Sequence, residues 1–406
     1  MNLTRRSLGL GALGTAFAAL TTGATPAQQR RRFVFVHAMG GWDPLCVFAP
    51  MFAASAIEME PEAQAATVGD FTLVDHPSRP LTVPFFQAWG DRTLLINGIN
   101  TRSVNHETCQ TVSLTGQTSD SAIDWPTALA VADTSAYYMP HLVFGGPAFP
   151  GEETVYVTRA EGFVQQAVSG ELLAYGDGAT TVPSTSERSR LDTYLEARAA
   201  AFDAKHGLPI TRDQHLASQR GHDLVAADVI AFPPGDTMQA LATGAVRALA
   251  DEVTRCATLS SGFLWDTHPD NGVQSGLFEG LFADLDYMLK LLSTTAAPEG
   301  GMLSQSTTVV VMSEMARTPA FNATQGRDHW PYTSAMIIGP GVTGGRTIGG
   351  YTDLYAGIGV DPKSGEPDPS RKGIDAKILG ATLLALGGVD PAEYISKPEV
   401  IEGVLA

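Results

Sequence analysis

The sequence predicts an α/β protein with a central, mostly parallel β-sheet, flanked by helices on both faces and interrupted by a helical insertion. Three observations lead to this class. Short apolar runs of strand length recur along the chain, helical segments lie between several of them, and one long stretch is helical in pattern without strand signals. Because parallel strands need crossover connections, this alternation favours a parallel sheet covered on both faces.

Seven runs have the length and composition of buried strands. They are rich in β-branched or aromatic residues and are bounded by Gly, Asp or Asn. In chain order they cover residues 32–38, 92–98, 141–146, 153–158, 262–266, 307–313 and 334–341.

Helices and loops connect these strands. Apolar residues recur at intervals of three and four in residues 277–295, which predicts an amphipathic helix. Residues 373–389 have the same character and end in glycines suited to stopping a helix. The stretch 184–260 is mostly helical in pattern and is interpreted as an insertion or cap. Residues 58–70 and 361–373 are polar, contain Pro and Gly, and are predicted to be loops.

The first 27 residues are typical of an export signal and are set apart from the fold. Arg5 and Arg6 form a twin-arginine pair, and the apolar run at 8–20 is shorter than the ~20 residues of a membrane span. The alternative is a tail that happens to contain two arginines. We expect the twin-arginine translocase to export residues 28–406 to the periplasm or the medium, as a chain without a stable membrane span.

Charge and cysteine content exclude two further classes. The formal net charge of −17 becomes −19 when Arg5 and Arg6 are removed, which argues against a nucleic-acid partner. Such a surface repels an anionic substrate unless a bound cation reverses the local field. The three cysteines, Cys46, Cys109 and Cys256, allow at most one disulfide and have no metal-ligand spacing, so a disulfide framework is excluded.

Ionisable residues gather after the predicted strands, where ligands bind in open α/β sheets. Asp43 follows a Gly-Gly turn after the first strand, either as a metal ligand or as the cap of a helix beginning at Pro44. Asn105 and His106 follow the second strand. A helix starting there would direct backbone N–H groups at an anion, unless Asn105 is only a helix cap.

A third group, Asp266, His268 and Asp270, falls on a predicted loop. An imidazole with a carboxylate suits zinc, manganese or iron(II) better than calcium. The alternative is an Asx-turn beside an exposed histidine.

The fourth group follows the strand at 307–313. It brings five ionisable residues together in a short segment: Glu314, Arg317, Arg327, Asp328 and His329. If they are buried, each charge needs a partner. They form either two ion pairs, Glu314 with Arg317 and Arg327 with Asp328, or part of a one- or two-metal site in which Arg317 or Arg327 holds an anionic group.

These motifs resemble the bacterial domain of unknown function 1501 family, whose members are exported and usually carry a twin-arginine signal. The family is similar to the alkaline phosphatase and sulfatase superfamily, which uses a central mixed sheet and one or two metal ions to cleave phosphate or sulfate esters. The resemblance implies an alkaline-phosphatase-like fold for residues 28–406. In family order, the matching motifs are GGWDP (40–44), NHE (105–107), WDTHPDNGVQ (265–274), SEMARTP (313–319), GRDHW (326–330) and GATLLALGGVDP (380–391).

The resemblance also implies roles for individual residues. Asp328 would be a further metal ligand or a partner that orients a histidine. In a hydrolase of this kind, Arg317 or His106 would stabilise the developing negative charge. The favoured ion is zinc or manganese, with calcium or magnesium as alternatives. The implied metal ligands are Asp43, Asp266, His268, Glu314 and His329.

One departure concerns the nucleophile. Asn105 stands where the superfamily has a Ser, Thr or modified Cys, and the nearby Ser103, Thr108 and Cys109 do not occupy the matching position. Two hypotheses therefore follow. The first is an exported metal-dependent hydrolase of phosphate or sulfate esters, acting on an anionic small molecule or a glycan ester. The second is a non-catalytic binding or assembly protein on the same scaffold, working with a co-exported partner.

Overall fold

A computed structural model of the chain describes residues 31–119, 121–133, 137, 139–160, 173–175, 178–180, 184–207, 212, 216, 237–262 and 264–406. The predicted export signal lies outside these ranges, and so do residues 208–236 of the predicted insertion at 184–260, apart from 212 and 216. Within them, no helix combines the length and apolar character that crossing a membrane requires.

The core is an eight-stranded sheet in the order β14-β4-β13-β10-β1-β9-β5-β6. All of its strand pairings are parallel except those of β13, which runs antiparallel to β10 and β4. The predicted mostly parallel sheet is therefore confirmed. Its strands are β1 (Arg32–Ala38), β4 (Thr93–Asn100), β5 (His141–Val143), β6 (Val157–Arg159), β9 (Cys256–Ser260), β10 (Thr307–Ser313), β13 (Tyr332–Ile338) and β14 (Arg346–Gly349).

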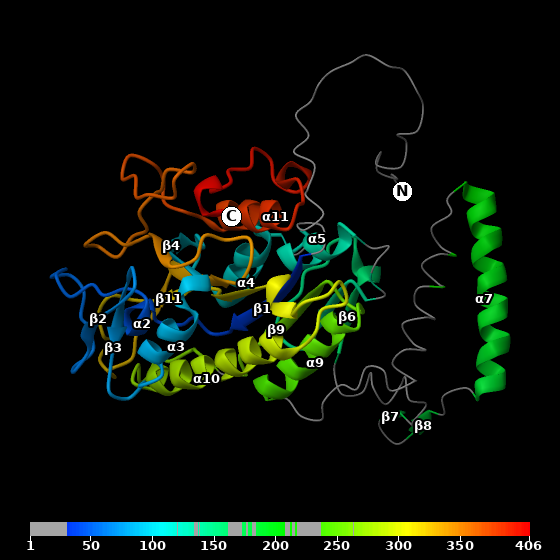
Figure 1. Ribbon diagram of the computed structural model, residues 1–406, viewed down its shortest axis with the longest axis horizontal. Coiled ribbons are helices and arrows are strands. Elements are labelled where there is room, and N and C mark those ends of the chain that lie inside the picture. Colours follow the sequence, from blue (N-terminus) through cyan, green and yellow to red (C-terminus); the bar gives the residue numbers. More distant parts are fainter. Residues whose placement is uncertain are drawn as a thin grey trace, which may run out of the picture.

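Helices cover both faces of the sheet (Figure 1). One face packs against α3 (Thr82–Trp89), α9 (Met238–Ala250) and α10 (Val273–Thr294); the other packs against α4 (His106–Thr115), α5 (Trp125–Val131) and α11 (Ala376–Leu386). The alternation along β1 shows why both layers form. Val34 and Val36 belong to the apolar core on the α10 side, whereas Phe33 and Phe35 belong to the core on the α11 side.

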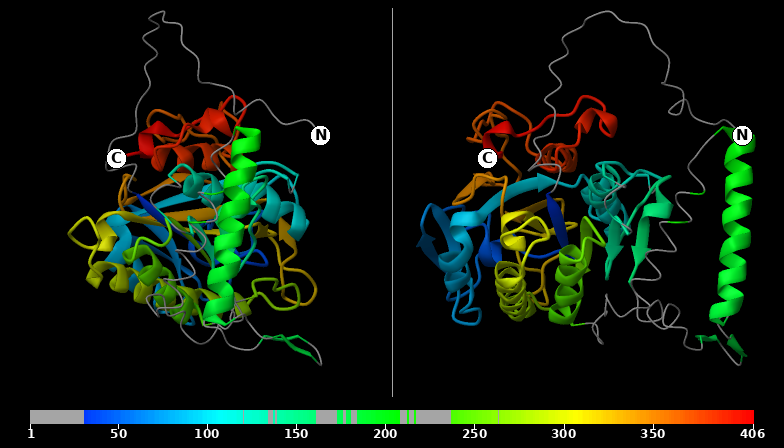
Figure 2. Two further views of the ribbon diagram at one scale, coloured as in Figure 1. Left: turned by 90° about the vertical axis from the view of Figure 1, so that its right-hand side faces the viewer. Right: turned by 45° about the vertical axis from the view of Figure 1, so that its right-hand side comes forward.

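Smaller elements complete the described chain. Figures 1 and 2 show α7 (Thr185–His206) lying apart from the two helical layers. The remaining elements are α2 (Pro44–Val47), the two-stranded sheets β2 (Gln64–Val68) with β3 (Phe71–Asp75), β7 (Leu173–Tyr175) with β8 (Gly178–Thr180) and β11 (Ala316–Arg317) with β12 (His329–Trp330), and the 3₁₀ turns at Gly90–Arg92, Thr154–Tyr156, Leu303–Gln305, Pro391–Glu393 and Glu402–Val404.

Several predicted elements are wrong or shifted. The strand expected at 262–266 lies earlier, at β9 (Cys256–Ser260), inside a stretch predicted to lack strands. The sequence of β9 has little strand propensity, but pairing with β1 and β5 on its two sides holds it in the sheet. Residues 58–70, predicted to be a loop, include β2, whose five residues are mostly small and are exposed or half-buried, so that they form no strong apolar pattern. The run at 153–158 begins as a 3₁₀ turn, and the strand starts only at Val157.

The three cysteines remain free. Cys46, Cys109 and Cys256 are each buried, and none forms a disulfide. Burial raises the pKa of the Cys46 thiol well above its ordinary value. These residues therefore serve as small apolar core side chains, consistent with the sequence having no disulfide framework.

Candidate metal centre

The predicted site residues meet where loops leave the sheet. His106 begins α4 after β4, Asp266 lies on the loop between β9 and α10, and Glu314 directly follows β10. His329 reaches the same place because β12 pairs with β11, in a register that sets His329 opposite Arg317. The chain thus delivers side chains from four distant segments to one edge of the sheet.

Three donor atoms form a compact triangle. Asp266 Oδ1 lies 3.1 Å from His268 Nε2 and 3.2 Å from His329 Nε2. The two Nε2 atoms lie 2.8 Å from each other. All three atoms can bind a metal ion, and all three point toward one another.

The opposite nitrogen of each imidazole has its own partner. His268 Nδ1 lies 2.8 Å from a carboxylate oxygen of Asp328, and His329 Nδ1 lies 2.7 Å from the carbonyl oxygen of Val104. Both partners are acceptors, so each Nδ1 atom carries the proton. In the neutral rings, the Nε2 atoms that face each other consequently carry lone pairs.

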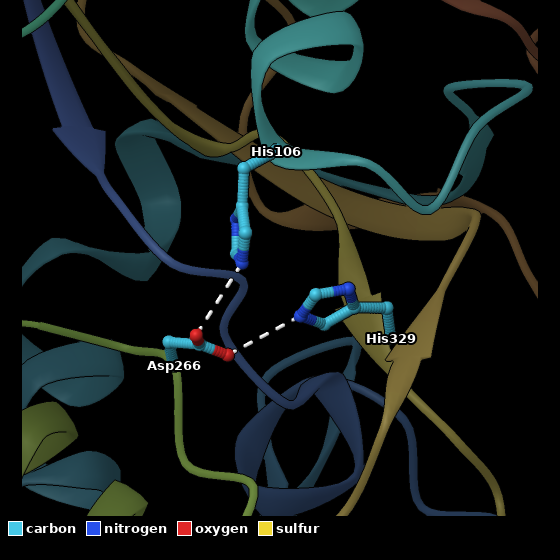
Figure 3. Close-up of side chains that lie close together, drawn as sticks. All are labelled: His106, Asp266 and His329. Carbon is cyan, nitrogen blue, oxygen red and sulfur yellow. Dashed lines mark hydrogen bonds and ion pairs between the residues drawn. The ribbon is translucent and has the colours of Figure 1, made fainter.

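His106 approaches Asp266 from the other side (Figure 3). Its Nε2 lies 3.4 Å from Asp266 Oδ2, and its Nδ1 lies 3.0 Å from Glu314 Oε1. The hydrogen bond with Glu314 is the main reason why the pKa of His106 is raised. The nearest donor atoms of His106, Asp266 and His329 all lie within 4.8 Å of one another, as in a metal site.

Glu314 is buried and anchored by the loop after β1. Its carboxylate accepts a hydrogen bond from the Gly40 N–H at 2.7 Å. Burial would raise the pKa of Glu314, but the hydrogen bond from His106 helps to lower it overall. Gly40 has a φ of +115°, and a Cβ atom there would lie 2.5 Å from the Asp266 backbone nitrogen. Only glycine therefore fits where these two loops touch.

Arg317 holds the carboxylate of Asp266 in place. Its Nη2 atom donates to Asp266 Oδ1 at 2.8 Å, and the guanidinium also donates to the carbonyls of Gly40, Gly41, Trp265 and Arg327. Burial alone would raise the pKa of Asp266, but the hydrogen bond from Arg317, the strongest of the effects that lower it, helps to bring it to about 2. The pairing of Arg317 with Glu314 that the sequence left open is not formed, because Arg317 binds the loops that carry Asp266.

Asp43 and Arg327 form a separate, fully buried pair. Arg327 Nε lies 3.2 Å from Asp43 Oδ2, and Asp43 Oδ1 accepts from the Leu45 N–H, capping α2. Arg327 also donates to the carbonyls of Thr318 and Glu58. The structure therefore places Asp43 outside the triangle, in the helix-capping role that the sequence offered as its alternative. The other alternative pair, Arg327 with Asp328, is not formed.

Three other residues near the start of α4 make local contacts and do not join the triangle. Asn105 is exposed, and its side chain caps the helix by accepting from the Thr108 N–H at 3.0 Å. Ser103 Oγ accepts from the Asn105 N–H, and Cys109 is buried with its thiol pKa raised by burial. Asp270 accepts from the Gly272 N–H in an Asx-turn and does not join the triangle.

Sequence reasoning missed two buried residues beside the site. His37 on β1 is fully buried, has no hydrogen bond on either ring nitrogen, and has its pKa lowered by burial despite the charge of Glu314. Gln274 joins the loops by accepting from the Asp43 N–H and donating to the carbonyls of Gly41 and Trp265. The only signal for Gln274 was its place at the end of the motif at 265–274.

Fold and site together define an α/β protein that gathers a carboxylate and three imidazoles at the carboxyl edge of a mostly parallel sheet. The chain belongs to the family described as "Protein of unknown function (DUF1501)", whose profile matches residues 127–363. The family expected from the sequence motifs is thus confirmed. Among curated proteins, none matches this chain.

Several solved structures are similar to this chain at low identity. Ps i-CgsB in complex with k-i-k-neocarrahexaose is 10% identical, with 91% of this chain and 75% of that chain covered and a TM-score of 0.41. Lipoteichoic acid synthase LtaP from Listeria monocytogenes is 10% identical, with 93% and 75% covered and a TM-score of 0.39. Phosphonate monoester hydrolase of Agrobacterium radiobacter is 12% identical, with 88% and 74% covered and a TM-score of 0.36.

Proposed function

We propose that the protein is an exported, metal-dependent hydrolase of phosphate or sulfate esters. One observation carries the metal site: the Nε2 atoms of His268 and His329 lie 2.8 Å apart while both Nδ1 atoms face acceptors. Two nitrogen lone pairs and the carboxylate oxygen of Asp266 then point at one another. This arrangement repels itself unless a cation lies among the three atoms or one of the rings takes up a second proton, and a bound divalent ion satisfies all three atoms at once.

The donor spacing fits a small divalent ion. Ligands at about 2.0–2.1 Å from zinc are about 2.9 Å apart at right angles and about 3.4 Å apart at the tetrahedral angle. The three donors here are separated by 2.8–3.2 Å. Imidazole and carboxylate together favour zinc or manganese, and the two Nδ1 partners supply the outer hydrogen bonds that orient metal-binding histidines.

The surrounding residues support hydrolysis of an ester. A divalent ion bound here would polarise an ester oxygen and lower the pKa of a bound water. Glu314 orients the ring of His106, whose Nε2 atom accepts no hydrogen bond and faces the triangle. His106 is thereby positioned to exchange a proton with water or a leaving group. Arg317 keeps Asp266 ionised and in place.

Reaction class and location rest on the sequence. The motifs that resemble the alkaline phosphatase and sulfatase superfamily support phosphate or sulfate esters as substrates, and the pair Arg5 and Arg6 supports export to the periplasm or the medium. The anionic substrate would approach an acidic chain, so the bound cation is what would attract it.

Metal content and turnover of the purified mature chain test this proposal. We expect about one divalent ion per chain and turnover that zinc or manganese restores after chelation. The His329→Ala variant should lose both. His76→Ala is the matched control, because His76 is half-buried, like His329, and bonds only Ser78 and the Pro61 carbonyl among the described contacts of its ring. A metal-free chain without turnover on phosphate or sulfate esters, even after zinc, manganese, magnesium or calcium is added, would overturn the proposal.

A second function is a non-catalytic binding or assembly role on the same scaffold. The observation that favours it is Asn105, whose side chain caps α4 and offers no hydroxyl or thiol for covalent catalysis. In that case the metal would only stabilise the loops. A co-exported protein that co-purifies with both the natural chain and His268→Ala, together with absence of turnover, would favour this role over hydrolysis.

A further inference from the structure

We infer that the site prefers esters with a single negative charge, namely phosphodiesters or sulfate monoesters, over doubly charged phosphate monoesters. The inference rests on the proposed function and concerns the charges that surround the same atoms. It follows from the partners that the cationic side chains near the triangle already have.

Arg317, whose guanidinium contacts the triangle, has no exposed nitrogen that could bind a ligand. The Arg317 side chain is 0% exposed, and each of its three nitrogens donates to a protein oxygen. Turning it toward a substrate would leave buried loop carbonyls without donors. Arg317 therefore orients Asp266 and cannot clamp an ester.

Arg327 is committed in the same way. Its side chain is 0% exposed and pairs with Asp43, and its terminal nitrogens donate to the carbonyls of Thr318 and Glu58. The expectation that Arg317 or Arg327 holds an anionic group therefore finds no support in the structure. Both arginines instead donate to backbone carbonyls of the loops around the site.

The charges around the triangle provide no partner for a second negative charge on a substrate. Three carboxylates lie around the histidines, on Asp266, Glu314 and Asp328, against the single guanidinium of Arg317. A divalent ion would bring this total to zero. Because Arg317 and Arg327 both bind protein oxygens, neither is left for a second negative charge. The second charge of a phosphate monoester would therefore lose water without gaining a partner.

Arg102 is the exposed guanidinium on the loop between β4 and α4, the loop that leads to His106. Its side chain is 59% exposed and pairs with Asp375, the residue that caps α11. It contacts none of the triangle residues in the described structure. Because Arg102 is exposed, it could leave Asp375 and bind a substrate anion at small cost. Replacing Arg102 therefore tests whether a guanidinium serves the second charge.

Three substrates with the same leaving group test the inference: p-nitrophenyl phosphate, its methyl ester and p-nitrophenyl sulfate. On the metal-loaded chain we expect kcat/KM for the methyl ester, the sulfate or both to exceed that for p-nitrophenyl phosphate by at least about tenfold. Whichever of the two dominates identifies the ester class. Equal or faster turnover of p-nitrophenyl phosphate would overturn the inference and leave the proposed function standing. No turnover of any of the three would instead count against the proposed function.

Binding provides a readout that does not depend on turnover. At a pH where phenylphosphonate carries two negative charges, its monomethyl ester should stabilise the metal-loaded chain against heat at lower concentration than phenylphosphonate itself. Arg102→Gln should leave both results unchanged. Stronger stabilisation by phenylphosphonate, or a loss of its binding specific to Arg102→Gln, would show that a guanidinium serves the second charge and would overturn the inference.

Discussion

Replacing Arg317 by Met should destabilise the protein severely, although Met fills a similar apolar volume. The carbonyls of Gly41 and Trp265 keep Gln274 as a donor after the change. The carbonyls of Gly40 and Arg327 lose the donor that Arg317 provides. An unpaired buried carbonyl costs about 1–3 kcal/mol, and Asp266 also loses its counter-charge, so the free energy of unfolding should fall by about 3 kcal/mol or more.

Urea unfolding of the natural chain and the variant measures this loss as a shift of the midpoint at constant slope. Arg102→Met is the matched control, because removing an exposed ion pair should cost less than about 1 kcal/mol. If Arg317→Met lost no more than Arg102→Met, the loop carbonyls would have found other donors. The assignment of Arg317 as the residue that holds these loops together would then be refuted.

Two further predictions address metal binding and pH. Asp328→Asn should weaken zinc binding by about tenfold in equilibrium dialysis, the low end for an outer-shell partner because the Asp328 side chain is 62% exposed; unchanged affinity would show that Asp328 does not orient His268. Burial lowers the pKa of His141 from 6.5 to about 3 between Thr127 and Thr258. The unfolded chain therefore binds a proton that the folded chain rejects, so stability should fall as pH drops below 6.5, by up to about 5 kcal/mol near pH 3. His141→Gln should flatten this slope in urea unfolding, and an unchanged slope would assign the acid sensitivity to other groups.

The fold was predictable where local pattern and tertiary environment agree. The runs that became β1 and β10 are apolar along their whole length, because the sheet buries both of their faces. The pattern failed where the environment overrides composition. Strand β9 has few β-branched residues yet lies between two other strands, and β2 is built mainly from small residues and lies exposed in a two-stranded hairpin. Neighbours in space hold these segments in place, and no local signal records them.

The same division applies to the candidate site. Asp266, His268 and His329 could be proposed together from sequence because each lies in a motif at or after the end of a predicted strand. The position of Asp43 could not be decided, since a helix cap and a metal ligand use the same carboxylate beside the same turn. His37 gave no signal, because a lone histidine in an apolar strand is indistinguishable from an ordinary core residue.

By itself, the sequence determined the family, the mostly parallel sheet and the ionisable residues that follow its strands. Only the tertiary structure decided which of those residues meet and which nitrogen of each imidazole is available. The reason is that proton position and charge pairing depend on atoms distant in the chain. The Val104 carbonyl sets the tautomer of His329, and Asp328 sets that of His268. Backbone carbonyls from the loops after β1 and β9 hold the guanidinium of Arg317.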